Sequence, residues 1–255
     1  MALLDISGLK KTYTTRLGGN QVTALKNITF TVEEGEYVAI MGESGSGKTT
    51  LFNLLAALDK PTGGQIQLDG RPMSDLSEKE ISAFRRDKLG FVFQDFNLLD
   101  TFSLRDNIFL PLVLQGKSYN DMAAALKPIA NLLGISDILS KFPYEVSGGQ
   151  KQRAAVARAL ITKPRLVLAD EPTGALDSMS SKELLKLFSA INHAGQTILM
   201  ATHSVGAASH ARRVLFLKDG EIFHQLYRGD KTEEEMYKKI SDTLTVLASG
   251  GETHA

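Results

Sequence analysis

The pattern of apolar and polar positions divides the chain into short strand-like runs separated by helical stretches. Several runs are apolar at nearly every position, as are strands buried on both faces of a parallel sheet. We therefore predict an α/β fold with a mostly parallel sheet. The strand-like runs are LLDISGLKKTYT (3–14), ALKNITFTV (24–32), YVAIMG (37–42), QIQLDG (65–70), LGFVFQ (89–94), RLVLADE (165–171), TILMATH (197–203), VLFLKDG (214–220) and EIFHQLY (221–227).

The early runs have a different pattern. ALKNITFTV alternates between apolar and polar residues, and turn signals stand at Glu34-Gly35 and at Thr62-Gly63-Gly64. Alternation is typical of strands with one solvent-facing side, and such strands pair through tight turns. We predict an N-terminal antiparallel β patch beside the parallel core.

Helical patterns replace the strand signals from about Asp95 to Gln150. We predict one domain whose core is interrupted by an α-helical lobe, followed by a helical tail. The tail contains MYKKISDTLTVL, whose apolar positions recur at intervals of three and four. This helix could pack on its own domain or bind a partner. The predicted ranges are 1–229 for the domain, 1–94 and 163–229 for its core, 95–162 for the inserted lobe and 230–255 for the C-terminal tail.

A glycine-rich loop follows the predicted strand at Tyr37–Met41 and precedes a helical pattern. It fits G-x-x-x-x-G-K-[ST] in the required context of strand, loop and helix. Glycines let backbone N–H groups and the helix N-terminus face an anion. Lys48 would reach the β- and γ-phosphates of a nucleotide, and the Thr49 hydroxyl would bind Mg²⁺. The predicted nucleotide-binding residues of the loop are Gly42, Glu43, Ser44, Gly45, Ser46, Gly47, Lys48, Thr49 and Thr50.

Polar side chains end three of the apolar runs. Asp170 and Glu171 end RLVLADE, and the carboxyl end of a parallel strand faces the crevice where such sheets bind ligands. Asp170 would hold Mg²⁺ through water, and Glu171 would polarise the water that attacks the γ-phosphate. Gln94 and His203 end two further runs. Taken alone, Gln94, His203 and the strand aromatic Tyr13 are equally compatible with structural roles.

Composition excludes several classes of protein. Lys plus Arg and Asp plus Glu both number 29, so no global basic charge would attract nucleic acid. Without cysteine there is no disulfide framework and no thiolate metal site, which fits a reducing cytosol. No apolar run approaches the roughly 18 residues of a transmembrane helix. The first residues, MALLDISGLKK, lack the pattern of a secretory signal.

Together and in this order, the motifs resemble those of the ATP-binding subunits of ABC transporters, over about residues 3–225. Ser147-Gly148-Gly149-Gln150 stands in the place of the family signature, and Ala175-Leu176-Asp177 in the place of the loop that crosses the dimer. Two positions depart from the family pattern. The signature begins with Val146 instead of Leu, and we expect Val146 to pack behind the loop without loss of function. The crossing loop begins with Gly174 instead of Ser, which would loosen it without removing Asp177.

The resemblance implies a P-loop NTPase fold that binds ATP and Mg²⁺. Tyr13 would stack on adenine, Gln94 would ligate Mg²⁺ and report the presence of the γ-phosphate, and His203 would position the γ-phosphate and the attacking water. The resemblance also implies a head-to-tail dimer in which the signature helix of a second copy closes over the ATP. Ser147 is expected as an N-cap that leaves the N–H groups of Gly148 and Gly149 open to that nucleotide. Hydrolysis would then require the dimer.

The permease must be a separate polypeptide, which would contact the helical lobe near Phe96–Asp106 and hold this subunit at the cytoplasmic face of the membrane. FQDFNLLDT, DEPTGALDS and KDGEIFHQLYRGD most resemble the bacitracin- and lantibiotic-resistance transporters of Gram-positive bacteria, within a subgroup that also serves lipoprotein release and macrolide efflux. Members of this type commonly signal to a membrane histidine kinase. Two alternatives stay open: a regulatory partner of a non-transporting cell-division protein, and an ATPase for lipoprotein release or macrolide efflux. A cassette acting on ribosomes or DNA is disfavoured, since the chain has a single cassette, no heptad array and no cysteine.

Overall fold

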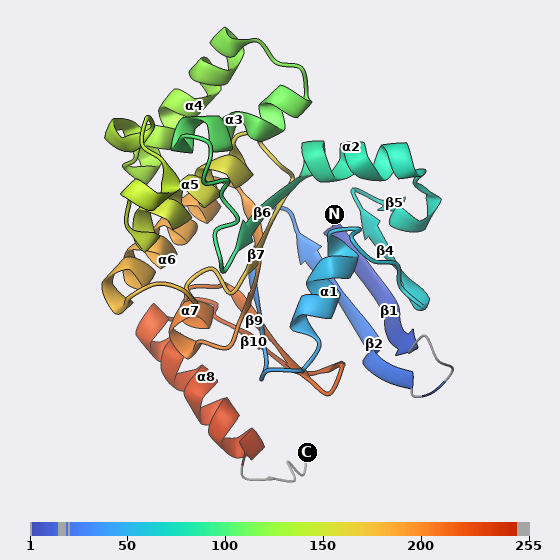
Figure 1. Cartoon of the computed structure of the whole chain (residues 1–255). Helices are drawn as coiled ribbons and strands as arrows, with labels where there is room; N and C mark the ends of the chain where they lie inside the picture. Colours follow the sequence, from blue (N-terminus) through green and yellow to red (C-terminus); the bar gives the residue numbers. More distant parts are fainter. Residues whose placement is uncertain (1, 15–18, 20, 249–255) are drawn as a thin grey trace.

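The computed structural model describes residues 2–14, 19 and 21–248, which form two β-sheets with helices around them (Figure 1). One sheet has the strand order β2-β1-β4-β5 and the other the order β10-β9-β3-β8-β7-β6. The strands are β1 (Ala2–Thr14), β2 (Gln21–Glu33), β3 (Tyr37–Met41), β4 (Gly63–Leu68), β5 (Arg71–Pro72), β6 (Leu89–Phe93), β7 (Leu166–Asp170), β8 (Thr197–Thr202), β9 (Arg213–Lys218) and β10 (Glu221–Tyr227).

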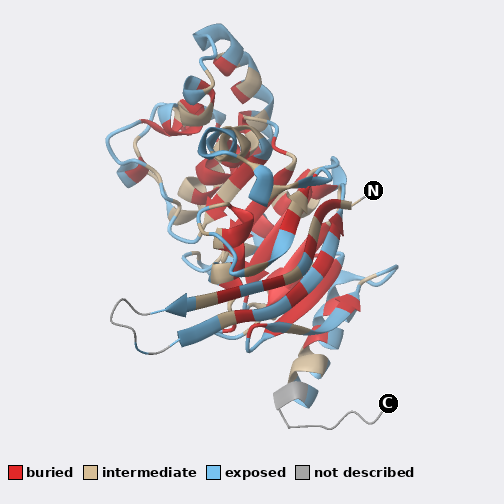
Figure 2. Ribbon diagram, turned by 90° about the vertical axis from the view of Figure 1, so that its right-hand side faces the viewer, coloured by how far each residue is buried: buried red, intermediate tan, exposed pale blue. Residues whose placement is uncertain are grey.

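The smaller sheet is antiparallel throughout. β1 pairs with both β2 and β4, and β4 pairs with β5. Along β2, Ile28, Phe30 and Val32 are buried while Thr29 and Thr31 are exposed. This alternation places one face on the core and the other in solvent, as Figure 2 shows for the long hairpin of β1 and β2. The predicted N-terminal antiparallel patch is confirmed.

The larger sheet is parallel except at one edge. β3, β6, β7, β8 and β9 run in the same direction, and β10 pairs antiparallel with β9. β3 and β8 are buried at every position, which explains their continuous apolar sequences. The carboxyl ends of β3, β6, β7 and β8 therefore meet at one edge of the sheet. The predicted mostly parallel α/β core is confirmed.

Two helices belong to the first half of the core. α1 (Lys48–Leu55) follows β3, and α2 (Glu78–Lys88) follows the short 3-10 turn η1 (Met73–Asp75). The hydrophobic pattern did not predict α2, because none of its residues is fully buried. Its signal is a capping box, in which Ser77 accepts a hydrogen bond from the Glu80 N–H and the Glu80 carboxylate accepts one from the Ser77 N–H.

The chain between β6 and β7 forms the helical lobe. α5 packs on α3, α4 and β6. Because β6 and β7 are neighbours in the sheet, the lobe is an excursion between two adjacent parallel strands. The exact limits of the lobe, residues 95 and 162, stay predictions. The elements of the lobe are α3 (Leu104–Leu114), α4 (Tyr119–Leu133), η2 (Ser136–Ile138), η3 (Pro143–Glu145) and α5 (Gly148–Leu160).

Three helices complete the part of the chain that the structure describes: α6 (Ser178–His193), α7 (Val205–Ser209) and α8 (Glu233–Ala248). α8 packs on α7, and its Met236 and Ile240 are fully buried in the core. The amphipathic helix of the tail thus packs on its own domain. Residues 249–255 of the predicted tail lie outside the described residues. In the described part of the chain, no helix combines the length and the apolar character that crossing a bilayer would need.

Candidate nucleotide site

The glycine-rich loop connects β3 to α1. Lys48 is buried, and its ammonium group donates hydrogen bonds to the carbonyls of Gly42 (2.7 Å) and Glu43 (3.0 Å). Gly47 has a φ of 108°, and a Cβ atom there would lie 2.8 Å from the Ala24 carbonyl oxygen. This position therefore requires glycine, both for its backbone conformation and for the close approach of β2. The loop wraps around the lysine head group.

Three charged or polar groups meet beyond this loop. Nζ of Lys48 lies 3.9 Å from Oε1 of Glu171. The same oxygen lies 2.9 Å from Nδ1 of the His203 ring. The backbone N–H of His203 donates a hydrogen bond to the other oxygen of the Glu171 carboxylate, Oε2, over 3.4 Å. These residues come from α1 and from the ends of β7 and β8, which pair in parallel. The fold thus brings together a cation, a carboxylate and an imidazole that are far apart in the sequence.

These groups line a hollow of about 620 Å³ at the carboxyl edge of the sheet. Its size and the polar side chains that line it suit the triphosphate group of a nucleotide. The predicted residues Glu43, Ser44, Gly45, Gly47, Lys48, Thr49, Thr50, Gln94, Asp170, Glu171 and His203 line it, together with Ala24. Gly42 and Ser46 lie in the same loop, where Ser46 donates its N–H to the Glu43 carbonyl over 3.2 Å.

Asp170 is the second carboxylate of this hollow. Burial, followed by the charge of Glu171, raises the pKa of its carboxyl group, while Lys48 acts in the opposite direction. A cation bound close to Asp170 would favour the charged form of its carboxyl group, which burial and Glu171 disfavour.

The hollow also contains the predicted magnesium ligands. The Thr49 hydroxyl, the Gln94 amide and the Asp170 carboxylate all line it. In the described residues no group of three or more His, Cys, Asp or Glu forms a metal cage. This oxygen-rich and incomplete donor set fits Mg²⁺, which is usually held by one or two carboxylates together with waters and substrate phosphates.

Tyr13 does not line this hollow. It lies on β1, and 42% of its surface is exposed. Its hydroxyl donates to Oδ2 of Asp59 over 3.0 Å, and the Lys11 ammonium lies 4.8 Å from the ring centroid. Lys11 also pairs with Asp59 at 2.6 Å. Asp59 cannot be predicted as a partner of Tyr13 from the sequence, because a single aspartate after a helix has no distinctive pattern.

The signature residues lie apart from the hollow. Ser147 is the N-cap of α5, where its hydroxyl accepts the Gln150 N–H and its own N–H donates to the Gln150 side chain. The predicted N-cap is confirmed. Within the chain, positions 148 and 149 face the crossing loop and the start of α6, because a Cβ on Gly148 would lie 3.6 Å from Leu176 and one on Gly149 2.8 Å from the Ser180 hydroxyl.

The crossing loop connects β7 to α6. Asp177 caps α6 by accepting the N–H groups of Met179 and Ser180, both at 2.9 Å. At Gly174 an added Cβ would lie 2.9 Å from the Gln94 amide carbon. The glycine therefore lets the loop approach Gln94, and the expectation that it also loosens the loop stays a prediction. Val146, the other departure, packs on the core as expected.

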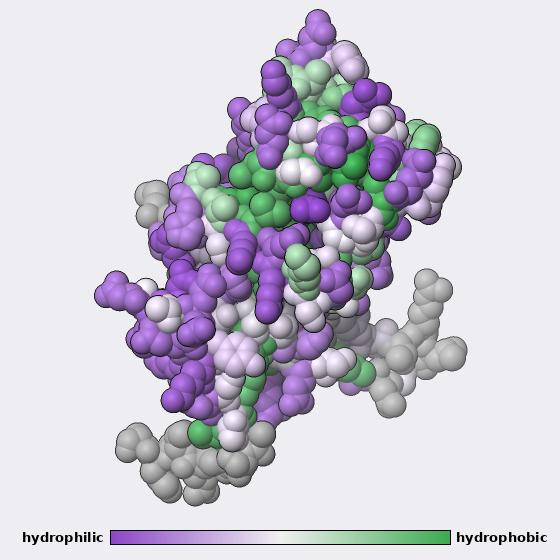
Figure 3. Space-filling view, turned by 90° about the vertical axis from the view of Figure 1, so that its left-hand side faces the viewer, coloured by the Kyte–Doolittle hydropathy of each residue, from purple (hydrophilic) through white to green (hydrophobic). Residues whose placement is uncertain are grey.

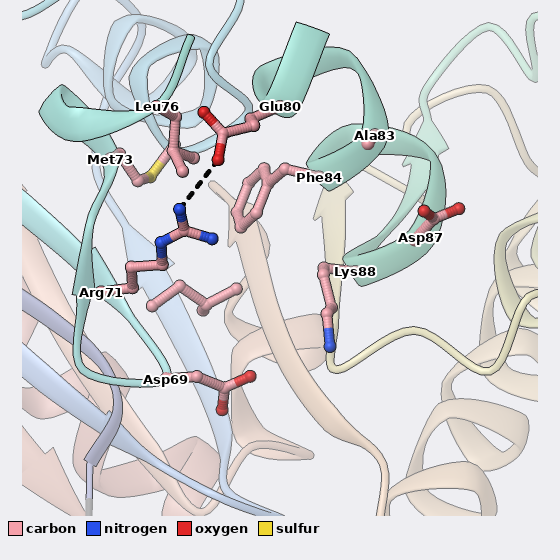
Figure 4. Close-up of a pocket in the computed structure, with 10 residues that line it drawn as sticks. Asp69, Arg71, Met73, Leu76, Glu80, Ala83, Phe84, Asp87 and Lys88 are labelled. Carbon is pink, nitrogen blue, oxygen red and sulfur yellow. Dashed lines mark hydrogen bonds and ion pairs between the residues drawn. The ribbon is translucent and has the colours of Figure 1, made fainter.

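A second hollow lies between the antiparallel sheet and α2 (Figure 4). Its volume is about 370 Å³, and Arg71 and Glu80 pair across it at 2.9 Å. None of the predicted site residues lines it. The hollow at the phosphate loop, and not this second one, contains the predicted lysine, carboxylates, glutamine and histidine.

Comparison with known proteins agrees with this geometry. The profile of the ABC transporter family matches residues 25–174. The chain belongs to the ABC transporter family.

Several curated ABC transporter proteins match this ATP-binding cassette over nearly its whole length. The uncharacterized ABC transporter ATP-binding protein YvcR of Bacillus subtilis is 48% identical over 255 residues, which are 100% of this chain and 97% of that protein. The bacitracin export ATP-binding protein BceA of Halalkalibacterium halodurans is 46% identical over 255 residues and covers 100% of both chains.

Solved structures show the same cassette fold. The cassette MJ0796, a protein of Methanocaldococcus jannaschii, has been described as a dimer in a post-hydrolysis state bound to ADP and Pi. It superposes with a TM-score of 0.80 at 37% sequence identity, covering 88% of this chain and 98% of that one. The P-loop NTPase core, the antiparallel sheet and the helical lobe are thus those of an ABC cassette.

Proposed function

We propose that this chain is the ATP-hydrolysing subunit of a transporter that exports or detoxifies antimicrobial peptides of the bacitracin and lantibiotic type. The observation that carries the ATPase activity is the meeting of Lys48, Glu171 and His203 at one hollow behind the phosphate loop. The peptide class is supported by the full-length similarity to the bacitracin export protein BceA.

In the proposed site, Lys48 leaves the carbonyls of Gly42 and Glu43 and binds the β- and γ-phosphates. Glu171 polarises the attacking water, and His203 holds the γ-phosphate in line with it. Thr49, Gln94 and Asp170 would hold Mg²⁺, which supplies charge neutralisation on the phosphates when it is bound. Tyr13 would stack on adenine.

The proposed active form is a head-to-tail dimer of two copies. Ser147, Gly148, Gly149 and Gln150 do not line the hollow of their own chain, so a second copy would have to bring its signature helix to the nucleotide. The N-terminus of α5 is suited to this, since open N–H groups and the helix dipole attract phosphate. Asp177, at the start of α6, would lie at the same interface. The dimeric structure of the cassette MJ0796 supports a dimer as the active form.

The proposed membrane partner is a separate permease that docks on the helical lobe. A mostly apolar groove of about 500 Å³ lies between α2, β6 and the lobe, lined by Leu58, Phe91, Leu110, Pro111, Leu114 and Asn97 among others. Leu99 and Phe102, within the predicted contact region Phe96–Asp106, are also exposed. Figure 3 shows further apolar surface over the lobe. Docking there would hold the subunit at the cytoplasmic face, and signalling to a histidine kinase stays a prediction.

A gene deletion tests this proposal. Cells that lack the gene should become more sensitive to bacitracin or nisin, and the wild-type gene should restore resistance while a gene carrying Glu171→Gln should not. Unchanged sensitivity together with a division defect would instead support the regulatory alternative. Unchanged sensitivity with normal division would contradict both.

A further inference from the structure

We propose that Gln152, on the signature helix α5, is a positioning residue that holds Gln94 and Glu171 of its own chain in the geometry for hydrolysis. The proposal rests on the ATPase function proposed above. It adds a residue that neither the phosphate loop nor the carboxylate pair contains.

Gln152 is fully buried. Its Nε2 donates one hydrogen bond to the Phe93 carbonyl at 3.1 Å and another to the Pro172 carbonyl at 2.6 Å. Phe93 immediately precedes Gln94, and Pro172 immediately follows Glu171. One amide group therefore joins the backbone just before Gln94, at the end of β6, to the backbone just after Glu171, beyond the end of β7.

The amide of Gln152 donates hydrogen bonds but accepts none within the described part of the chain. The two carbonyl acceptors require the NH₂ group to face them, and Oε1 then has no hydrogen-bond partner among the described residues. A buried acceptor without a partner is costly, and an apolar side chain of similar length would avoid that cost. The donated bonds are therefore the physical reason to have glutamine at this position.

The backbone that Gln152 holds needs support. Glu171 has a φ of 46°, a left-handed conformation that is uncommon for a residue with a side chain. Strained conformations of this kind persist where the surrounding structure holds them. The bond from Gln152 to the next carbonyl, at Pro172, fixes the direction in which the chain leaves Glu171.

A second side chain of α5 holds the other side of Gln94. The guanidinium of Arg158 donates to the carbonyls of Asn97 at 2.5 Å and Phe96 at 2.9 Å. Both acceptor residues also have positive φ angles, of 50° and 63°. Gln152 and Arg158 thus bracket Gln94 from the same helix.

This arrangement places the proposed positioning residue close to the N-terminus of α5. Ser147 at its N-terminus is proposed to meet the nucleotide of a second copy, and Gln152 lies five positions, or about 1.4 turns of 3.6 residues each, further along the chain. A displacement of α5 on closure would move the Phe93 and Pro172 carbonyls with it. Closure at one nucleotide would then adjust the hydrolytic residues at the other.

The test uses Gln152→Met in the full chain, because methionine keeps the length and burial of the side chain but donates no hydrogen bond. Gln196→Met is the matched control, since Gln196 Nε2 also donates to two carbonyls, those of Pro164 (3.1 Å) and Thr197 (3.2 Å), at the opposite edge of the sheet. We expect Gln152→Met to lower kcat by about tenfold to a hundredfold with an unchanged Kd for ATP. Gln196→Met should leave both values as in the wild type.

An unchanged kcat in Gln152→Met would overturn the proposal, as would an equal loss of kcat in both variants or a parallel loss of kcat and ATP affinity. If Gln152→Met does not fold, Gln152→Leu provides the same test, because leucine is also apolar and donates no hydrogen bond. Gln152→Leu should lower kcat with ATP affinity retained, and an unchanged kcat would again overturn the proposal. Absence of hydrolysis by the folded wild-type chain would instead count against the proposed ATPase function itself.

Discussion

Nδ1 of His203 lies 2.9 Å from Oε1 of Glu171, although the two residues are 32 positions apart. Each stands at or just beyond the carboxyl end of its strand, and the parallel pairing of β7 with β8 brings the two ends together. The carboxylate also faces the ammonium group of Lys48. The three groups that the proposed mechanism uses, a carboxylate, an imidazole and an ammonium group, therefore lie together at the ends of neighbouring strands and the start of α1.

Replacing Glu171 tests its role as the base. Glu171→Gln keeps the shape of the side chain but removes its ability to polarise water, so kcat should fall by at least about a hundredfold. ATP binding should persist, and ATP-bound dimers should accumulate on gel filtration. Glu78→Gln is the control, because the Glu78 side chain is 85% exposed and does not line the hollow. Hydrolysis at the wild-type rate in Glu171→Gln would exclude Glu171 as the base.

Two N-cap serines separate helix stability from dimer function. Ser147 caps α5 and Ser118 caps α4 in the same way. Loss of either cap should cost about 1 kcal/mol of stability. Ser147→Arg should in addition abolish turnover and ATP-dependent dimerisation, because a bulky side chain would block the second copy. Ser118→Arg should keep both. Undiminished turnover in Ser147→Arg, or full activity of a monomer, would contradict the shared site.

Tyr13 is expected to contribute to nucleotide affinity through its ring. Tyr13→Ala should weaken ATP binding by about 1 to 3 kcal/mol, as loss of a base–aromatic stack does. Tyr13→Phe should bind ATP nearly as well, since it loses only the hydrogen bond to Asp59. Titration with a fluorescent ATP analogue measures both variants. Tyr144→Ala, at a residue that is 68% exposed on the lobe, is the control. Equal affinity in wild type and Tyr13→Ala would remove Tyr13 from the site.

Asp170 should make the nucleotide-free chain sensitive to pH. Burial, followed by the charge of Glu171, raises its pKa, so the folded state favours the protonated carboxyl group. Its contribution to stability is therefore fully present below the ordinary aspartate pKa of about 3.9, and is lost as the pH rises through the raised value. Asp170→Asn should then have a higher Tm than the wild type at neutral pH and a similar Tm in acid.

Thermal unfolding across this pH range, with and without Mg²⁺ and ATP, measures the effect. Ligand binding should raise the Tm of the wild type more than that of Asp170→Asn, because the variant loses the carboxylate that favours the metal. A lower Tm for nucleotide-free Asp170→Asn at neutral pH would show that attraction by Lys48 outweighs burial and repulsion by Glu171.

The apolar groove provides a test of the permease contact. Leu114 is 72% exposed and lines the groove. Leu114→Asp should leave ATP hydrolysis by the purified chain unchanged but abolish resistance in cells, since a charge would oppose apolar docking. Leu132→Asp is the control, because Leu132 is 50% exposed on α4 and does not line the groove. Full resistance with Leu114→Asp would place the permease elsewhere.

Structural features that depend on a few consecutive residues could be predicted from the sequence. The apolar runs predict the buried strands β3, β7 and β8 because burial on both faces demands apolar residues at every position. The glycines, Lys48 and Thr49 predict the phosphate loop because its conformation depends on consecutive residues. The polar helix α2 was missed, since its stability comes from capping and surface contacts and not from a buried stripe.

Features that depend on strand register and helix docking could not be predicted. The residues alone show which groups are available: a lysine in a glycine-rich loop, two carboxylates at a strand end, a serine before two glycines. The fold adds that His203 contacts Glu171, that Asp59 accepts a hydrogen bond from Tyr13, and that Gln152 joins the carbonyls beside Gln94 and Glu171. These hydrogen bonds cross between elements, and a contact between distant segments is specified by how whole strands and helices pack.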